Sequence, residues 1–156
     1  MLVLVEGVDG SGKSQLIKEL TYKGYISCKP GFNASWFDLF SSNEDKIMVC
    51  DRCFISDIVY RIEDNKPRQD ISLGFACDLM RLYGAKIIYC KNENSFDKAL
   101  ERGEDNVTTK ERSDRLSNIY DIVMSLLNKF VDIPVYEYDY TKQNVQNVID
   151  FIEEDN

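Results

Sequence analysis

The sequence predicts a three-layer α/β fold, in which a five-stranded parallel sheet is flanked by helices. Short apolar segments alternate with longer segments of helical periodicity, which is typical of strands that are buried on both faces and joined by helices. Parallel strands need such crossovers, and these are right-handed. No repeat, low-complexity tract or Gly/Ser linker interrupts the alternation, so we expect a single domain over residues 1–156.

The first half of the chain contains three predicted strands and two predicted helices. Met1–Glu6 is dominated by apolar residues, and three more apolar residues follow it at helical spacing. A Pro-Gly pair ends the second strand, and residues 32–45 show no clean period, which indicates a loop with a helical turn around 36–40. In order, we expect a strand at Met1–Glu6, a helix at Ser14–Leu20, strands at Tyr25–Cys28 and Lys46–Cys50, and a helix at Ser56–Ile62.

The second half continues the alternation with two strands and four helices. The longest helix has apolar residues on one stripe, and Ser95 is the expected N-cap of the helix that precedes it. In order, we expect a helix at Ile71–Tyr83, a strand at Lys86–Cys90, helices at Ser95–Arg102 and Glu111–Phe130, a strand at Val135–Tyr138 and a helix at Val145–Ile152.

The charge balance restricts the partners and the chemistry. With 27 acidic and 19 basic residues the chain has a formal charge of −8, which repels polyanions at long range, so extended duplex DNA is not the expected partner. The chain has no histidine, the commonest general base. Its chemistry must therefore use carboxylates, lysine, arginine, hydroxyls or a metal ion.

The cysteines and the hydropathy pattern predict a cellular compartment. Five cysteines that lack Cys-x-x-Cys spacing at two places, in a chain that has no histidine to complete a zinc site, are expected to be reduced thiols. No apolar run reaches about 18 residues, and Met1–Val5 is too short, and lacks the basic flank, for a secretion signal. We expect a cytoplasmic protein without a membrane partner.

Residues 7–14 form the strongest motif of the sequence. They read Gly-Val-Asp-Gly-Ser-Gly-Lys-Ser, the phosphate-loop (P-loop) pattern, between a predicted strand and a predicted helix. The glycines let successive N–H groups point at a phosphate, and the helix N-terminus adds its positive end. Lys13 is expected to bridge the β- and γ-phosphates of a nucleoside triphosphate, and Ser14 to ligate Mg²⁺. The residues expected to hold the nucleotide are Gly7, Gly10, Ser11, Gly12, Lys13, Ser14 and Gln15.

An acidic and a basic residue follow the strand that ends at Cys50. Asp51 and Arg52 stand at the edge where open α/β sheets bind ligands, although Asp51 as a helix N-cap gives the same pattern. Asp51 is expected to reach Mg²⁺ or the hydroxyl of the acceptor, and Arg52 to hold the acceptor. Asp9 would be repelled by bound phosphates unless it faces the acceptor or a metal, so we expect it to orient or deprotonate the acceptor hydroxyl.

Four more residues are candidates for binding the acceptor. Lys29 ends the second strand at the same edge and could hold an acceptor phosphate, although an ordinary surface lysine fits as well. Phe32 lies just beyond it, where an aromatic ring either stacks on a base or packs in the core. Ser56 and Tyr60 lie one helical turn apart and could offer hydroxyls to the acceptor.

The segment around residues 102–115 is a candidate lid. It is a polar loop that begins with glycine, joins two predicted helices and is flanked by Arg102, Arg112 and Arg115. A mobile loop can bring an arginine over the γ-phosphate after the nucleotide binds, which neutralises charge in the transition state. Arg102 and Arg112 are the expected catalytic residues. The alternative is a solvated surface with helical ion pairs.

The residues quoted above resemble the thymidylate kinase family of P-loop nucleoside and nucleoside-monophosphate kinases, over nearly the whole chain. The similar segments are residues 3–16 (VLVEGVDGSGKSQL), Lys29-Pro30-Gly31, Asp51-Arg52-Cys53 with Ser56 and Tyr60, residues 86–103 (KIIYCKNENSFDKALERG), Tyr120 and Tyr138-Asp139. In the same order, they are similar to the N-terminal segment of family members, the end of their Arg-Glu-Pro-Gly segment, their Asp-Arg-Tyr motif, the strand and helix before their lid, the tyrosine after the lid and the residues that follow the last strand.

The resemblance implies a P-loop kinase fold, ATP as phosphoryl donor and Mg²⁺. It further implies that Asp9, Arg52 and Tyr60 face the acceptor nucleotide, and that Arg102 and Arg112 belong to the lid. Gly10 stands where some members carry an arginine, so the catalytic arginine would come from the lid. By the same resemblance, Thr141, Lys142 and Gln143 would border the adenine.

Departures from the family pattern concern the acceptor. Cys53 replaces the aromatic residue of the Asp-Arg-Tyr motif, and the stretch between Tyr60 and Lys86, which builds much of the thymine pocket, is shorter than usual. A curtailed pocket suits another nucleotide, a nucleoside, or a hydroxymethylated pyrimidine within DNA, as in phage base-modifying kinases. A local cluster could hold such a strand despite the acidic charge. Its members would be Lys29, Arg52, Arg61 and Arg68.

We interpret the chain as a Mg-ATP-dependent kinase of a deoxynucleotide such as dTMP, or of a related nucleoside compound. One alternative is a kinase acting on hydroxymethylated pyrimidine in DNA, and another is a regulatory module that binds a nucleotide without turning over an acceptor. The sequence lacks the Asn-Lys-x-Asp segment that reads guanine in nucleotide switches. A homodimer through Ile71–Tyr83 is compatible with the pattern, but a helix buried in a monomer gives the same one.

Overall fold

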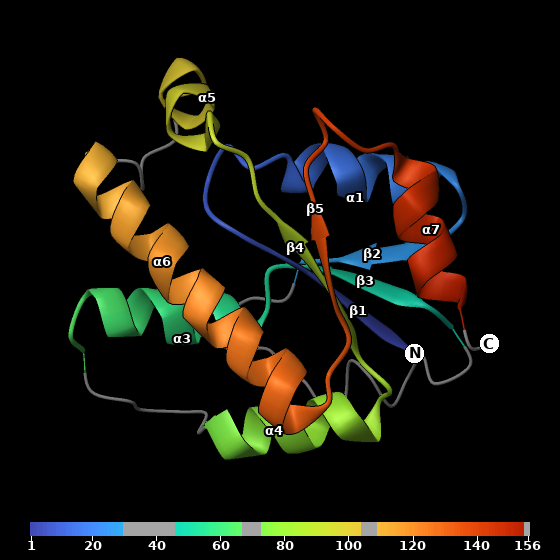
Figure 1. Cartoon of the computed structure of the whole chain (residues 1–156). Helices are drawn as coiled ribbons and strands as arrows, with labels where there is room; N and C mark the ends of the chain where they lie inside the picture. Colours follow the sequence, from blue (N-terminus) through green and yellow to red (C-terminus); the bar gives the residue numbers. More distant parts are fainter. Residues whose placement is uncertain (30–45, 67–72, 104–108, 155–156) are drawn as a thin grey trace.

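The computed structural model describes residues 1–29, 46–66, 73–103 and 109–154, and it confirms the predicted α/β class (Figure 1). Five parallel strands form one sheet in the order β2-β3-β1-β4-β5. The strands are β1 (Leu2–Glu6), β2 (Ile26–Cys28), β3 (Met48–Asp51), β4 (Lys86–Cys90) and β5 (Val135–Tyr138).

Helices lie on both faces of this sheet. Figure 1 shows α1 and α7 on one face and α3, α4 and α6 on the other, with α5 beyond the edge where the strands end. The helices are α1 (Lys13–Tyr22), α3 (Phe54–Glu63), α4 (Leu73–Leu82), α5 (Ser95–Glu101), α6 (Lys110–Leu126) and α7 (Val145–Glu153).

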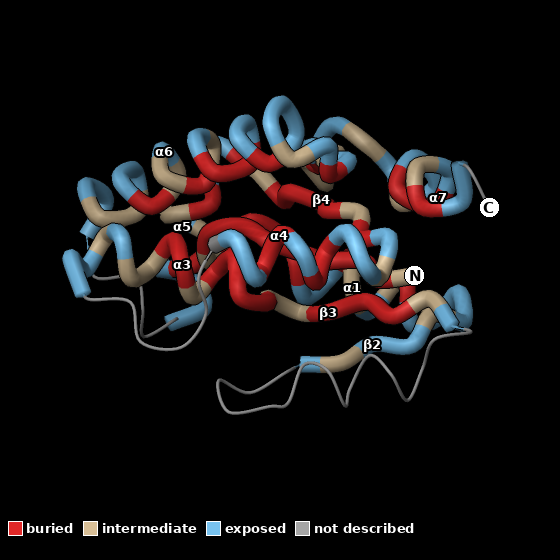
Figure 2. Tube along the Cα trace, turned by 90° about the horizontal axis from the view of Figure 1, so that it is seen from below, coloured by how far each residue is buried: buried red, intermediate tan, exposed pale blue. Residues whose placement is uncertain are grey.

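The central strand explains why the sheet needs two covering layers. In β1, Leu2 and Leu4 belong to the core beneath α3, α4 and α6, whereas Val3 and Val5 belong to the core beneath α1 and α7. Successive strand residues point to opposite faces, so an unbroken apolar run buries both. Figure 2 shows the resulting pattern. Strands β3 and β4 are largely buried, the edge strand β2 is mostly exposed, and helix α6 is buried on one side and exposed on the other.

Most predicted helix ends differ from the observed ones by one or two residues, and two differences are informative. The helix predicted at Glu111–Phe130 ends at Leu126 and continues as a π-helical turn, η1 (Leu127–Val131), which stops at Asp132 with a left-handed φ of 59°. Ser95 is the first helical residue of α5 and not its cap, because Asn94 occupies the capping position. Across the described ranges, no helix combines the length and the apolar character needed to span a membrane.

The sheet order determines where a ligand can meet the most side chains. The chain leaves β1 toward β2 and β3 on one side, whereas β4 and β5 lie on the other. In open α/β sheets the crevice at such a switch point, outside the carboxyl ends of the strands, binds ligands. The segments after β1, β3 and β4 therefore define the region of interest.

Candidate active site

The phosphate loop follows β1 and is shaped by its glycines. Gly7, Gly10 and Gly12 have φ values of 137°, 76° and 94°, in the range that side chains disfavour. A Cβ atom at Gly7 would overlap the backbone oxygen of Cys90, and one at Gly10 would overlap that of Ser95. The loop therefore packs backbone against backbone beside the segment after β4, and only glycine fits at these two positions.

Lys13 is the first residue of α1, and its side chain folds back over the loop. The side chain is only 6% exposed, and its Nζ donates a hydrogen bond to the Val8 carbonyl oxygen at 2.6 Å. Burial, and then the charge of Arg52, lower the pKa of Lys13 to about 8. The loop thus holds a cation that would be stabilised by a nearby anion.

Ser14 and Gln15 lie in the first turn of α1 and are exposed. Gln15 donates to Glu19 on the same helix, so its predicted contact with the nucleotide stays a prediction. Asp51 ends β3, and its carboxylate lies 3.5 Å from the ammonium of Lys29, which is 77% exposed. Phe32, which was also predicted to bind the acceptor, lies outside the described residues.

A metal site was predicted from Ser14 and Asp51. Within the described ranges, no three cysteine or carboxylate side chains gather as a ligand set of their own. Magnesium at phosphate sites usually keeps several waters and takes only one or two protein oxygens in addition to those of the substrate. An exposed hydroxyl at the start of α1 and a carboxylate that is 18% exposed at the end of β3 fit that sparse donor set.

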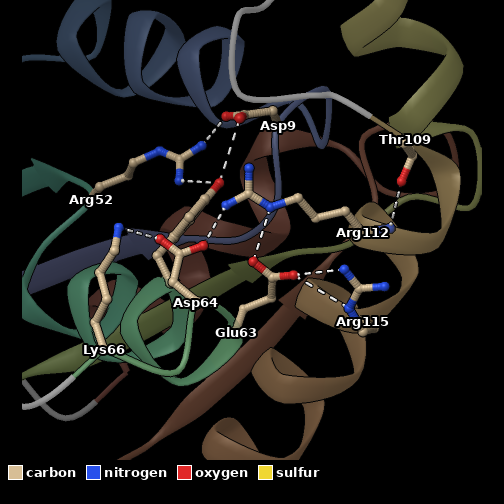
Figure 3. Close-up of polar contacts among 9 residues, drawn as sticks. Asp9, Arg52, Glu63, Asp64, Lys66, Thr109, Arg112 and Arg115 are labelled. Carbon is tan, nitrogen blue, oxygen red and sulfur yellow. Dashed lines mark hydrogen bonds and ion pairs between the residues drawn. The ribbon is translucent and has the colours of Figure 1, made fainter.

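Asp9, Arg52 and Tyr60 form one cluster at the loop, and Figure 3 labels Asp9 and Arg52 of this cluster. Arg52 pairs with the Asp9 carboxylate and donates to the Tyr60 hydroxyl at 3.2 Å, and that hydroxyl lies 3.4 Å from the other Asp9 oxygen. Arg52 has a left-handed φ of 61°, and its backbone N–H donates to Val5 at 3.1 Å. A strained backbone at a site is a marker of functional constraint. The sequence placed these three residues at the acceptor individually, and the structure brings them into contact.

Glu6 lies beneath this cluster and was missed by the sequence analysis. It is fully buried at the end of β1, and it accepts hydrogen bonds from the backbone N–H of Cys53 and from the Ser56 hydroxyl. Burial raises its pKa to about 7, against the opposing effects of Ser56 and Arg52. An acidic residue at the end of an otherwise apolar strand was the available signal.

Ser56 continues this buried chain toward helix α6. Its side chain is 6% exposed, and its oxygen lies 2.7 Å from the hydroxyl of Tyr120. The predicted role of Ser56 as an acceptor ligand stays a prediction, because in this structure its hydroxyl is engaged inside the protein. Glu6, Ser56 and Tyr120 instead connect the end of β1, helix α3 and helix α6.

The arginines of the predicted lid helix pair with the end of α3 (Figure 3). Arg112 donates to Glu63 at 2.9 Å and to Asp64 at 2.8 Å, and Arg115 donates to Glu63 at 2.8 Å. The Glu63 carboxylate is only 5% exposed, so both guanidinium groups are held at one nearly buried acid. The Thr109 side chain caps α6 by accepting from the backbone N–H of Arg112.

The remaining lid residue lies at the end of the preceding helix. Arg102 is exposed and follows the last residue of α5. Residues 104–108, at the centre of the predicted lid, lie outside the described ranges. The structure therefore places Arg112 beside α3 and Arg102 at the far end of the segment, and it leaves the catalytic roles of both as predictions.

The segment after β5 reaches the other side of the phosphate loop. A Cβ atom at Gly12 would overlap the ring of Tyr140, so this ring packs directly on the loop. Thr141 donates to Asp139 at 2.7 Å, and Lys142 pairs with Glu93 at 3.2 Å. Two of the three residues predicted to border the adenine, Thr141 and Lys142, thus lie in a segment held next to the loop.

The arrangement has two chemically different halves. On one side, a glycine-shaped loop with an inward lysine offers N–H groups and positive charge to a polyphosphate. On the other side, a paired carboxylate and guanidinium can exchange their mutual contact for a hydroxyl and a phosphate. The two halves are covalently connected, because Asp9 belongs to the loop.

Comparisons with known proteins concern mainly the fold. No protein-family model and no curated protein matches the chain. Solved structures do match. YorR protein from Bacillus subtilis, in complex with phosphorylated GDP, superposes with a TM-score of 0.72 at 20% identity, over 98% of this chain and 96% of its own.

Two further structures belong to named kinases. Deoxyadenosine kinase from M. mycoides with bound dCTP gives a TM-score of 0.60 at 17% identity, with 99% of this chain and 97% of that chain covered. Thymidylate kinase from Candida albicans gives 0.55 at 13% identity, with 98% and 91% covered. At these identities the similarity establishes the fold. The chain has a three-layer α/β fold, which it shares with these structures.

Proposed function

We propose that the chain is a Mg²⁺- and ATP-dependent kinase that transfers the γ-phosphoryl group to a deoxynucleotide such as dTMP or to a related nucleoside compound. The observation that carries the proposal is the position of the Asp9–Arg52–Tyr60 cluster directly beside the phosphate loop. A site for a polyphosphate next to a site for a second polar molecule is what phosphoryl transfer between two small molecules requires.

On the donor side, we assign the β- and γ-phosphates to the loop amides and to Lys13. The buried ammonium would exchange its hydrogen bond with the Val8 carbonyl for the charged phosphate oxygens. Magnesium, held by Ser14 and the phosphates and approached by Asp51, would supply further charge neutralisation. Thr141 and Lys142 would border the base.

On the acceptor side, we assign recognition to the ion pair. Arg52 would hold an acceptor phosphate or hydroxyl through its fork of donors, and Asp9 would orient the attacking hydroxyl. Tyr60 bonds to both and would maintain their spacing. Lys29 is placed to contribute a further positive charge near Asp51.

The lid arginines would stabilise the transition state. Arg112 bonds to Glu63 and Asp64 only one helical turn beyond Tyr60, so a small displacement of α6 would bring it to the acceptor cluster. Arg102 approaches from the opposite end of the lid segment. We assign the catalytic charge to one of these two residues.

The compounds bound by the structural neighbours indicate which acceptors to test. YorR is in complex with phosphorylated GDP, deoxyadenosine kinase holds products including dCMP, and the Candida albicans thymidylate kinase has broad substrate specificity. The test is to incubate the chain with ATP and Mg²⁺ and with each of a panel of acceptors, following ADP formation. The panel holds deoxynucleosides, purine and pyrimidine monophosphates, and DNA containing hydroxymethyluracil.

The proposal predicts ADP formation that depends on one class of small acceptor. Release of ADP that is the same without any acceptor would indicate a hydrolytic switch and contradict it. Tight ATP binding without turnover would indicate a regulatory module. Turnover with the DNA alone would move the acceptor from a free nucleotide to a base within a strand.

A further inference from the structure

A pair of cysteine thiols lies directly behind the acceptor side of the site. Cys28 and Cys50 are register partners on the neighbouring parallel strands β2 and β3, and their Sγ atoms are 3.0 Å apart. Cys50 is fully buried, whereas Cys28 is only partly buried. The two thiols are therefore in contact, and one of them is accessible from solvent.

The contact makes the two sulfur atoms chemically unequal. The hydrogen bond with Cys50 lowers the pKa of Cys28, whereas Cys50 is fully buried and has no exposure to solvent. The thiolate is the reactive form of cysteine. Accessibility and thiolate character thus coincide on Cys28, with a second thiol in contact behind it.

The other three cysteines lack this combination. Cys53, Cys77 and Cys90 are buried, and burial raises the pKa of each. A thiol in such surroundings behaves as a small apolar side chain. Redox-sensing cysteines, by contrast, are accessible, have a low pKa and lie next to a resolving thiol.

We propose that Cys28 and Cys50 are a reversible oxidation site that forms an intramolecular disulfide on exposure to a peroxide. The Cys28 thiolate attacks one peroxide oxygen, the O–O bond breaks, and Cys28 becomes a sulfenic acid while water leaves after protonation. Cys50 then attacks the Cys28 sulfur, the S–O bond breaks, and a second water leaves with the Cys50 proton. Two thiols are oxidised and one hydrogen peroxide is reduced to two waters. A small thiol reductant reverses the bond by exchange.

The position of the pair connects this chemistry to the site. Lys29 and Asp51 follow the two cysteines directly, and they form the 3.5 Å ion pair at the carboxyl edge of the sheet. Strand β2 has three residues and lies at the edge of the sheet beside β3. A covalent bond between these strands would fix the spacing of Lys29 and Asp51.

The test is mass spectrometry of the full chain after treatment with hydrogen peroxide, blocking of the remaining thiols and proteolysis. We expect the loss of two of the five free thiols and a peptide pair joined through Cys28 and Cys50, both reversed by dithiothreitol. Cys28→Ser should abolish the joined peptides. Cys77→Ser, which removes a buried thiol on α4, should leave them at the level of the unmodified chain.

The readout does not depend on kinase activity, so it can fail or succeed separately from the proposed function. The proposal is overturned if all five thiols survive peroxide doses that oxidise a free thiol in the same tube. It is equally overturned if Cys28 is oxidised without a partner, or if joined peptides persist in Cys28→Ser through another cysteine. Because the first two outcomes are read from the unmodified chain, they hold even if a variant folds poorly.

Discussion

The proposed donor and acceptor sides of the site are held in different ways. The phosphate loop is fixed by backbone: two glycines pack against the chain after β4 so closely that a methyl group would not fit. The acceptor side is held by side chains, with Arg52 on Asp9 and with Arg112 and Arg115 on Glu63. Backbone packing persists whether or not a ligand is bound, whereas ion pairs can exchange partners. The comparison suggests that the donor side is preorganised and the acceptor side rearranges.

The most disruptive test of the donor side removes its charge. Lys13→Ala should lower kcat about 10²- to 10³-fold, because a charge directed at the transferring phosphoryl group is lost from a nearly buried position. ADP formation at saturating ATP and acceptor measures this. Lys18→Ala, which removes an exposed lysine from the same helix, should leave kcat within about twofold. Near-normal turnover in Lys13→Ala would refute the assignment of the loop.

The buried carboxyl group of Glu6 predicts how the free energy of unfolding depends on pH. The folded pKa of Glu6, about 7, lies above its unfolded value of 4.5, so the folded state binds the proton more tightly. The free energy of unfolding contributed by this group therefore falls as pH rises from 4.5 to 7, by about 3 kcal/mol in total.

The substitution Glu6→Gln keeps the shape of the side chain and removes its ionisable carboxyl group. Urea unfolding at pH 5 and pH 7.5 should show that this variant gains about 2 kcal/mol relative to the unmodified chain between the two conditions. Glu19→Gln, on α1, serves as the control for loss of a carboxylate elsewhere. An unchanged pH dependence in Glu6→Gln would show that Glu6 ionises normally and that the buried chain to Tyr120 is not formed.

On the acceptor side, Arg52→Lys keeps the charge and removes the fork that meets both Asp9 and Tyr60. The loss of a charge-assisted hydrogen bond should raise the KM for the acceptor about ten- to hundredfold and leave ATP affinity unchanged. Arg61→Lys is a matched control on helix α3, which follows Arg52, and there the arginine pairs with Asp57 one turn away. Loss of ATP affinity in Arg52→Lys would show that the two sides are not independent.

Two glycine substitutions separate the cost of disrupting the packing of the loop from the cost of placing a side chain at positive φ. Gly10→Ala and Gly84→Ala both place an alanine at positive φ, 76° and 55°, but only the first would overlap other backbone. Gly10→Ala should therefore cost about 1–3 kcal/mol more than Gly84→Ala in urea unfolding. Equal costs would mean that the loop can move away from Ser95, which would contradict its preorganisation.

The sequence predicted the elements whose signal is local. Runs of apolar residues gave all five strands, and the spacing of glycines, lysine and serine gave the phosphate loop, because backbone conformation there depends on neighbouring residues. The break of α6 into a π-helical turn after Leu126 was not predicted, since the apolar stripe continues through it.

The parts that could not be predicted depend on distant partners. Glu6 was read as the end of an apolar strand, because its hydrogen bonds come from residues about 50 positions away. Arg112 was expected over the phosphates, but in this structure it bonds to Glu63 and Asp64. Charge pattern along a chain indicates which side chains need partners, and only the fold determines which partners they find.

Calorimetric titration with Mg-ATP tests whether the loop binds a triphosphate through the buried Lys13. In the protein without ligand, Lys13 has a pKa of about 8, and a bound triphosphate should raise this pKa. Binding at pH 8 should therefore take up roughly half a proton. Titrations in two buffers of different ionisation enthalpy measure this uptake. The proton uptake should grow from pH 7 to pH 9 and disappear in Lys13→Ala. Binding without proton uptake, or binding unchanged in that variant, would contradict binding of the triphosphate through Lys13.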